Sequence, residues 1–110
     1  MSEEIEVRFD DAMMAVYQRA RDECHYNATR FLRMLHEHRG LGTARILLRA
    51  SRVSEGYVAL WERKRLDLTV EFLILTDEWR SLFSEGEREI ARNRLAEYGY
   101  TPADEGQKLP

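Results

Sequence analysis

The sequence predicts an all-α fold, a compact bundle of about six short helices in a single domain that covers residues 1–110. Apolar residues recur at helical spacing along most of the chain, and residues that begin or end helices stand between these stretches. Only 2 prolines and 6 glycines interrupt the 110 residues, so few positions break a helix. A chain of this length forms one domain with a single hydrophobic core.

The first predicted helix begins at Asp10 or Asp11, because a short carboxylate accepts hydrogen bonds from the free backbone N–H groups of a first turn. The inward stripe of this helix is Met13, Val16, Tyr17, Ala20 and Cys24. We expect the ordered core of the domain to span residues 9–100, with residues 1–8 and 101–110 flexible.

Three further helices follow in the first two thirds of the chain. Asn27 is predicted to cap a second helix from Ala28 to His38, and Gly40 to end it. A third helix is predicted over Thr43–Arg52. Ser54 then caps a fourth, whose aligned side chains are Tyr57, Leu60, Trp61 and Lys64.

The segment Leu66–Leu75 allows two interpretations. Its apolar residues alternate, which is typical of a strand, yet Asp67 as an N-cap before an apolar run is typical of a buried helix. We favour the helix, because a lone strand needs a partner and only Ile5–Phe9 offers one.

The last part of the chain carries the clearest helix start. A short helix is predicted from Thr76, carrying Trp79, Leu82 and Phe83. Ser84 and Glu87 then form a capping box, in which each side chain bonds the other residue's backbone N–H. The helix that this box opens carries Ile90, Ala91, Arg94, Leu95 and Tyr98, and Gly99 ends it.

Three segments together resemble a family of small bacterial proteins of about a hundred residues. They are YNATRFLRMLHEHRGLGTARILL, SEGYVALWERKRLDLTVEFLIL and LFSEGEREIARNRLAEYGY, and the resemblance covers residues 15–100. It implies a helical bacterial domain. It implies no activity and no functional residues.

Composition and cysteine usage limit the class of protein. The single cysteine, Cys24, rules out an internal disulfide framework and favours the cytoplasm. No stretch approaches the roughly 18–20 apolar residues that a membrane span requires, so we expect no membrane association. The acidic segment MSEEIEVRFDD is unlike a secretory signal.

Charge is unevenly distributed along the chain. Seven acids and three bases give residues 1–27 a net charge of −4, and three acids and nine bases give residues 28–65 a net charge of +6. Ten acids and five bases give residues 66–110 a net charge of −5. The basic centre predicts either a surface for an anionic partner or a block that the acidic ends neutralise on folding.

The basic centre also supplies the candidate functional residues. Arg45, Arg49 and Arg52 share one helix face, and a short turn leads from them to a helix ending in Arg63-Lys64-Arg65. Two short arginine-edged helices resemble a helix-turn-helix, although Glu55 and Glu62 on the second would repel phosphates. The candidate interface, for a partner protein or a nucleic acid, is Arg45, Arg49, Arg52, Trp61, Arg63, Lys64 and Arg65.

Catalytic and metal-binding arrangements are poorly supported. His36 and His38 point to opposite sides of one helix, so they cannot join Cys24 and His25 around one ion. Asp67 and Glu71 are four residues apart and could share a proton. The stronger interpretation is that Asp67 caps a helix, and that Glu71 is either exposed or paired with an arginine such as Arg63 or Arg65.

We therefore expect no catalytic residues, no metal and no cofactor. The predicted function is that of a non-catalytic binding or accessory module, acting through a protein partner or through self-association. The alternative is a nucleic-acid-binding module that uses the basic face.

Overall fold

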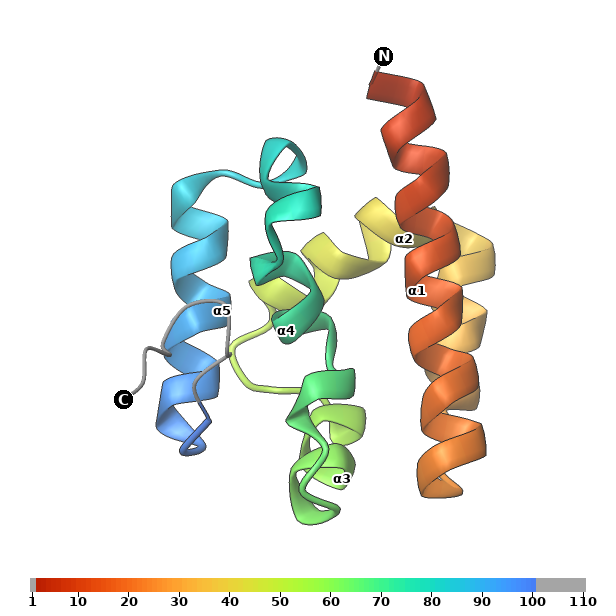
Figure 1. The fold of residues 1–110 in the computed structure, drawn as a ribbon, viewed down its shortest axis with the longest axis vertical. Helices are drawn as coiled ribbons and strands as arrows, with labels where there is room; N and C mark the ends of the chain where they lie inside the picture. Colours follow the sequence, from red (N-terminus) through yellow and green to blue (C-terminus); the bar gives the residue numbers. More distant parts are fainter. Residues whose placement is uncertain (1, 101–110) are drawn as a thin grey trace.

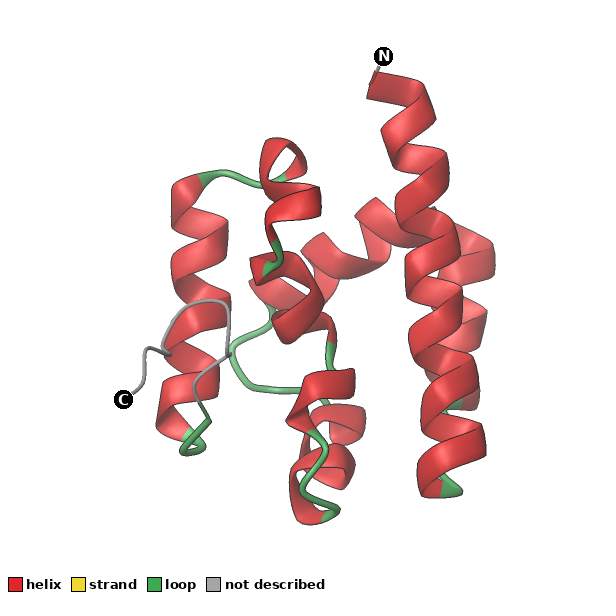
Figure 2. Cartoon of the chain, in the orientation of Figure 1, coloured by secondary structure: helices red, strands yellow, loops and turns green. Residues whose placement is uncertain are grey.

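The computed structural model describes residues 2–100 and confirms the all-α fold, with no strand among these residues (Figures 1 and 2). Five α-helices and two 3-10 helices make up this part of the chain. They are α1 (Ser2–Cys24), α2 (Thr29–Arg49), α3 (Glu55–Glu62), η1 (Leu66–Leu68), α4 (Val70–Leu75), η2 (Asp77–Leu82) and α5 (Glu85–Glu97).

Helix α1 is longer than the sequence predicted. It begins at Ser2, so the predicted start at Asp10 or Asp11 was wrong, and residues 3–8 belong to the helix. Glu3 and Glu4 lie in its first turn, where negative charge interacts favourably with the helix dipole. The buried stripe starts at Phe9 and continues through Met13, Tyr17 and Ala20. The predicted flexible segment 101–110 lies outside the described residues.

Helix α2 bends sharply at Arg39, whose backbone has φ 61° and ψ −176°. The break predicted near Gly40 is confirmed, but the second half starts immediately and ends at Arg49, so the range Thr43–Arg52 was wrong. Asn27 does not cap this helix, because its Oδ1 accepts a hydrogen bond from the Tyr17 hydroxyl at 2.9 Å.

The bend is held from α1 by Asp10. Its Oδ1 accepts a hydrogen bond from the Gly40 backbone N–H at 2.7 Å, and its Oδ2 accepts two from the Arg39 guanidinium at 2.7 and 3.0 Å. A non-glycine residue in such a backbone region costs on the order of 1–3 kcal/mol, so these bonds offset strain. Gly40 is buried and packs closely on α1, and a Cβ at this position would lie only 3.2 Å from the Cα of Asp10.

The ambiguous segment Leu66–Leu75 is helical but interrupted. Thr69 separates η1 from α4, and its hydroxyl accepts a hydrogen bond from the Phe72 N–H at 3.2 Å. Thr69 is therefore the cap of α4, and the prediction of Asp67 as the N-cap was wrong. Ser54 caps α3 as predicted, and the Ser84–Glu87 capping box opens α5.

The helices pack in two main pairs around one core. α1 packs chiefly on α2, and α5 packs chiefly on α4, with α3 beside the end of the second pair (Figure 1). The Phe9 ring of α1 is edge-on to the rings of Trp79 in η2 and of Phe83, with ring centroids 5.2 and 5.5 Å apart, so α1 packs on the segment that links α4 to α5. Ile90 of α5 is 39% exposed.

Two arginines of α5 donate hydrogen bonds to backbone carbonyls of neighbouring helices. Arg88 is 1% exposed, and its Nη1 donates a hydrogen bond to the Ile74 carbonyl in the last turn of α4 at 3.0 Å. Arg94 donates to the carbonyls of Leu47, Leu48 and Ala50 at the end of α2. Because the last carbonyls of a helix lack partners within it, α5 closes the ends of two neighbours.

Candidate binding groove

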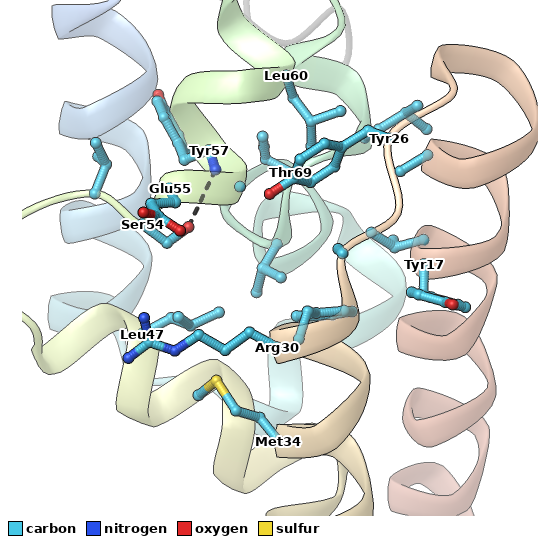
Figure 3. A pocket seen from close by; sticks show the side chains of 18 of the residues that line it. Tyr17, Tyr26, Arg30, Met34, Leu47, Ser54, Glu55, Tyr57, Leu60 and Thr69 are labelled. Carbon is cyan, nitrogen blue, oxygen red and sulfur yellow. Dashed lines mark hydrogen bonds between the residues drawn. The ribbon is translucent and has the colours of Figure 1, made fainter.

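The bend in α2 leaves a groove of about 590 Å³ on the bundle, which we call the α2 groove (Figure 3). Its walls come from the end of α1 with the loop that follows, both halves of α2, the start of α3, and residues 68–71. The volume lies in the range of roughly 300–1,000 Å³ that is usual for ligand sites. Much of the lining is apolar, including Phe31, Met34, Ile46, Leu47, Val53 and Leu60.

Polar side chains stand around this apolar surface. In Figure 3 the Arg30 side chain extends across the groove toward Leu47, and Ser54 and Glu55 lie on the facing wall. The hydroxyl of Tyr26 points into the space between these walls (Figure 3). Arg30 and Arg52 are exposed, and neither makes an ion pair with a carboxylate of residues 2–100. The groove therefore combines apolar surface with positive charge that the described residues leave unpaired.

Glu71, which lines the groove, belongs to a buried ion pair. Glu71 is 4% exposed, and its Oε2 accepts a hydrogen bond from Nη1 of Arg94 at 3.0 Å. Burial raises the pKa of Glu71, although the Arg94 guanidinium opposes that shift. Burial, with the neighbouring Glu71 carboxylate, also raises the pKa of Tyr57, whose hydroxyl donates to the Arg94 carbonyl at 3.0 Å.

This ion pair removes the support for acid–base chemistry at Asp67 and Glu71. Glu71 pairs with an arginine, as one of the sequence interpretations held, but that arginine is Arg94 and neither Arg63 nor Arg65. Asp67 pairs separately with Arg65 at 3.0 Å. A carboxylate that is sealed against an arginine does not hold a shared proton with a second carboxylate.

Several residues of the candidate interface are occupied by intramolecular contacts. Nε of Arg45 lies 3.0 Å from Glu87, and Arg65 bonds Asp67 and also Glu23, at 2.9 Å. Hydrogen bonds from Arg19 and Arg65 lower the pKa of Glu23 to about 2. The acidic ends thus neutralise part of the basic centre, which is one of the two outcomes that the charge distribution allowed.

The other residues of the candidate interface differ in their contacts and exposure. Arg63 donates to the carbonyls of Cys24 and Ala59 and lies over the Tyr26 ring at 5.3 Å. Trp61 is 44% exposed, with its ring edge-on to Tyr98 at 5.2 Å. Arg49 and Lys64 are exposed. Of the candidate set, Arg52 alone lines the α2 groove.

The histidines and the cysteine do not come together. His25, His36 and His38 are exposed, and Cys24 is partly buried at the end of α1. Within residues 2–100, no three His, Cys, Asp or Glu side chains are grouped closely enough to hold a metal ion. Nor does this part of the chain contain a helix with the length and apolar character of a membrane span.

Sequence reasoning missed the residues that make the groove, above all Tyr26, Arg30, Met34 and Ile46. Arg30 and Met34 are four apart and share one face of the first half of α2, which was the available signal. No pattern in the sequence indicated the angle between the two halves of α2. No family model, no curated protein and no solved structure matches the chain, so the resemblance to a bacterial family stays a prediction.

Proposed function

We propose that the protein is a non-catalytic binding module that acts through a protein partner, and that the partner contacts the α2 groove. The observation that carries the proposal is apolar surface next to arginines that no described carboxylate neutralises. The apolar lining favours burial of a partner's apolar side chains, and the unpaired charge of the arginines favours partners of opposite charge over others. Cytoplasmic placement belongs to the same proposal and rests on the single cysteine.

Ile46 offers a direct way to disturb the groove. It is 41% exposed and lines the groove from α2, whereas Ile90 is 39% exposed on α5 and does not line it. The Ile46→Glu and Ile90→Glu variants therefore add the same charge at equally exposed helical positions. Neither substitution buries the new carboxylate, so both variants should fold, which far-UV circular dichroism checks.

The experiment is quantitative affinity capture from the cells that produce the protein. We expect wild type and Ile90→Glu to retain the same protein, and Ile46→Glu to retain at least tenfold less of it, or about 1.4 kcal/mol of binding. Equal retention by Ile46→Glu and wild type would contradict the groove as the contact site. No retained protein, together with a monomer in sedimentation velocity at high concentration, would contradict the binding module itself.

Nucleic-acid binding stays a weaker prediction. The ion pairs of Arg45 with Glu87, and of Arg65 with Glu23, reduce the positive charge that a phosphate backbone would meet. A gel shift at low salt tests it, because binding through phosphates weakens steeply as salt increases.

A further inference from the structure

We infer that the occupant of the α2 groove is an amphipathic helix of a partner protein, apolar on the face that enters the groove and acidic on its flanks. This inference rests on the proposed function and specifies the partner's chemistry. Three features of the described residues carry it: the hydrogen bonding of the walls, the shape and lining of the groove, and the charge of its exposed arginines.

The walls determine the backbone conformation of the occupant. They are built mainly from helices, whose backbone N–H and C=O groups already bond each other, and residues 2–100 contain no strand whose edge could be extended. A segment that is buried in the groove must therefore satisfy its own backbone groups. A helix does so internally, whereas an extended peptide would bury unpaired N–H and C=O groups.

The lining determines which face of that helix enters. A volume of about 590 Å³ accommodates side chains from one helix face and leaves the helix axis outside. Met34 and Leu47, on the two halves of α2, would contact apolar anchors spaced at i, i+3 or i+4, and i+7. The flexible side chain of Met34 can adjust to the shape of each anchor.

The exposed arginines of the lining determine the charge that the flanks of the partner helix should carry. Arg30 and Arg52 are exposed, line the groove and make no ion pair with residues 2–100, so each can bond a carboxylate. Their guanidinium groups suit carboxylates because each presents parallel N–H donors. Glu55 is the exposed acid in the lining, so an acidic helix would lie with its carboxylates toward the arginines.

The test uses designed peptides, because charge complementarity can be reversed on both sides. The probe is a fluorescein-labelled 15-residue helical peptide with leucines at i, i+3, i+4 and i+7 and two flanking glutamates. A second peptide carries lysines at the flanks, and a third scrambles the first. Binding is measured by fluorescence anisotropy at about 0.15 M salt, where exposed charges more than about 8 Å apart are screened.

We expect the glutamate peptide to bind wild type at least tenfold more tightly than the lysine peptide or the scrambled peptide. In the Arg30→Glu/Arg52→Glu variant this preference should reverse. The matched control is Arg33→Glu/Arg49→Glu, which changes the net charge equally at exposed arginines outside the lining and should keep the wild-type preference.

Three results would overturn the inference. The first is equal binding of the glutamate and lysine peptides to wild type, and the second is an unchanged preference in Arg30→Glu/Arg52→Glu. The third is sedimentation velocity showing a dimer that Ile46→Glu dissociates, because the occupant would then be a second copy of this chain. If the peptides fail while Ile46→Glu still loses the captured protein, the proposed function holds and the helical acidic partner is wrong.

Discussion

Replacing Arg94 by methionine should destabilise the domain strongly, and more so as pH rises. The variant leaves Glu71, which is 4% exposed, without its partner. The carboxylate would then be protonated in the folded state. Relative to its ordinary pKa of 4.5, protonating a glutamate at pH 7 costs about 3.4 kcal/mol, because each pH unit corresponds to about 1.4 kcal/mol. This is the upper limit of the loss relative to wild type, because the raised pKa of Glu71 already places part of that cost on the wild-type fold. This value agrees with the roughly 3–5 kcal/mol for breaking a buried pair.

The sign of the pH dependence follows from proton binding. In Arg94→Met the folded state holds the Glu71 proton while the unfolded state releases it above pH 4.5, so stability falls as pH rises. The penalty should shrink to about 1 kcal/mol at pH 5. The variant also loses the hydrogen bonds from Arg94 to the α2 carbonyls. This loss adds little to the change in the free energy of unfolding where water can replace the guanidinium, as at the exposed Ala50.

Urea unfolding followed by circular dichroism at pH 5 and pH 7 measures the effect. With an m-value of about 1.5 kcal/mol/M, the midpoint at pH 7 should fall by about 2 M. Arg80→Met is the control, since Arg80 is 57% exposed and its ion pairs with Asp77 and Glu85 should be worth at most about 1 kcal/mol. Equal losses in the two variants, or a penalty for Arg94→Met that does not change with pH, would refute the reasoning.

Three further substitutions test other parts of the structure by the same unfolding assay. The pKa of Glu71 is raised in the fold, so the stability of wild type relative to Glu71→Gln should decrease as pH rises above 4.5; an increase would mean that Arg94 outweighs burial. Gly40→Ala should cost about 1–3 kcal/mol because its Cβ would press on α1, whereas Gly42→Ala, which meets only the Cβ of His38, should be near neutral; equal effects would contradict the close approach at the bend. Ser84→Ala should cost about 0.5–2 kcal/mol by removing the bond to the Glu87 N–H at 3.1 Å, and no change in stability would show that this cap is dispensable.

Local features of the fold were predictable where interacting residues are close in sequence. The capping box of Ser84 and Glu87 spans three residues, and the Ser54 cap likewise bonds the N–H three residues on. Asp67 and Thr69 are both good caps and lie two residues apart, so only packing could decide between them. Residues 3–8 have few apolar side chains, which hid the first turns of α1.

The groove was not predictable, because it depends on contacts between distant residues. The bend at Arg39 exists through bonds to Asp10, which lies 29 residues earlier, and no local pattern encodes such a pairing. Arg94 was expected on the last helix, but its partner Glu71 lies 23 residues away, and no local pattern links the two. Residue type alone favoured the nearer arginines, Arg63 and Arg65, and those bond other groups instead.

Arg88 and Arg94 attach α5 to its neighbours through hydrogen bonds that depend on the side chain of the donor but not on that of the acceptor. Apart from the bond of Arg94 to Glu71 and the ion pair of Arg88 with Glu85 at 3.9 Å, these guanidinium groups bond main-chain oxygens, which every amino acid provides. Leu47, Ala50 and Ile74 can therefore be exchanged for other residues without deleting an acceptor, whereas a single change at Arg88 or Arg94 deletes the donor. In a deep mutational scan, substitutions of these two arginines should be poorly tolerated. Substitutions at the residues whose backbone carbonyls accept their hydrogen bonds should leave those bonds intact.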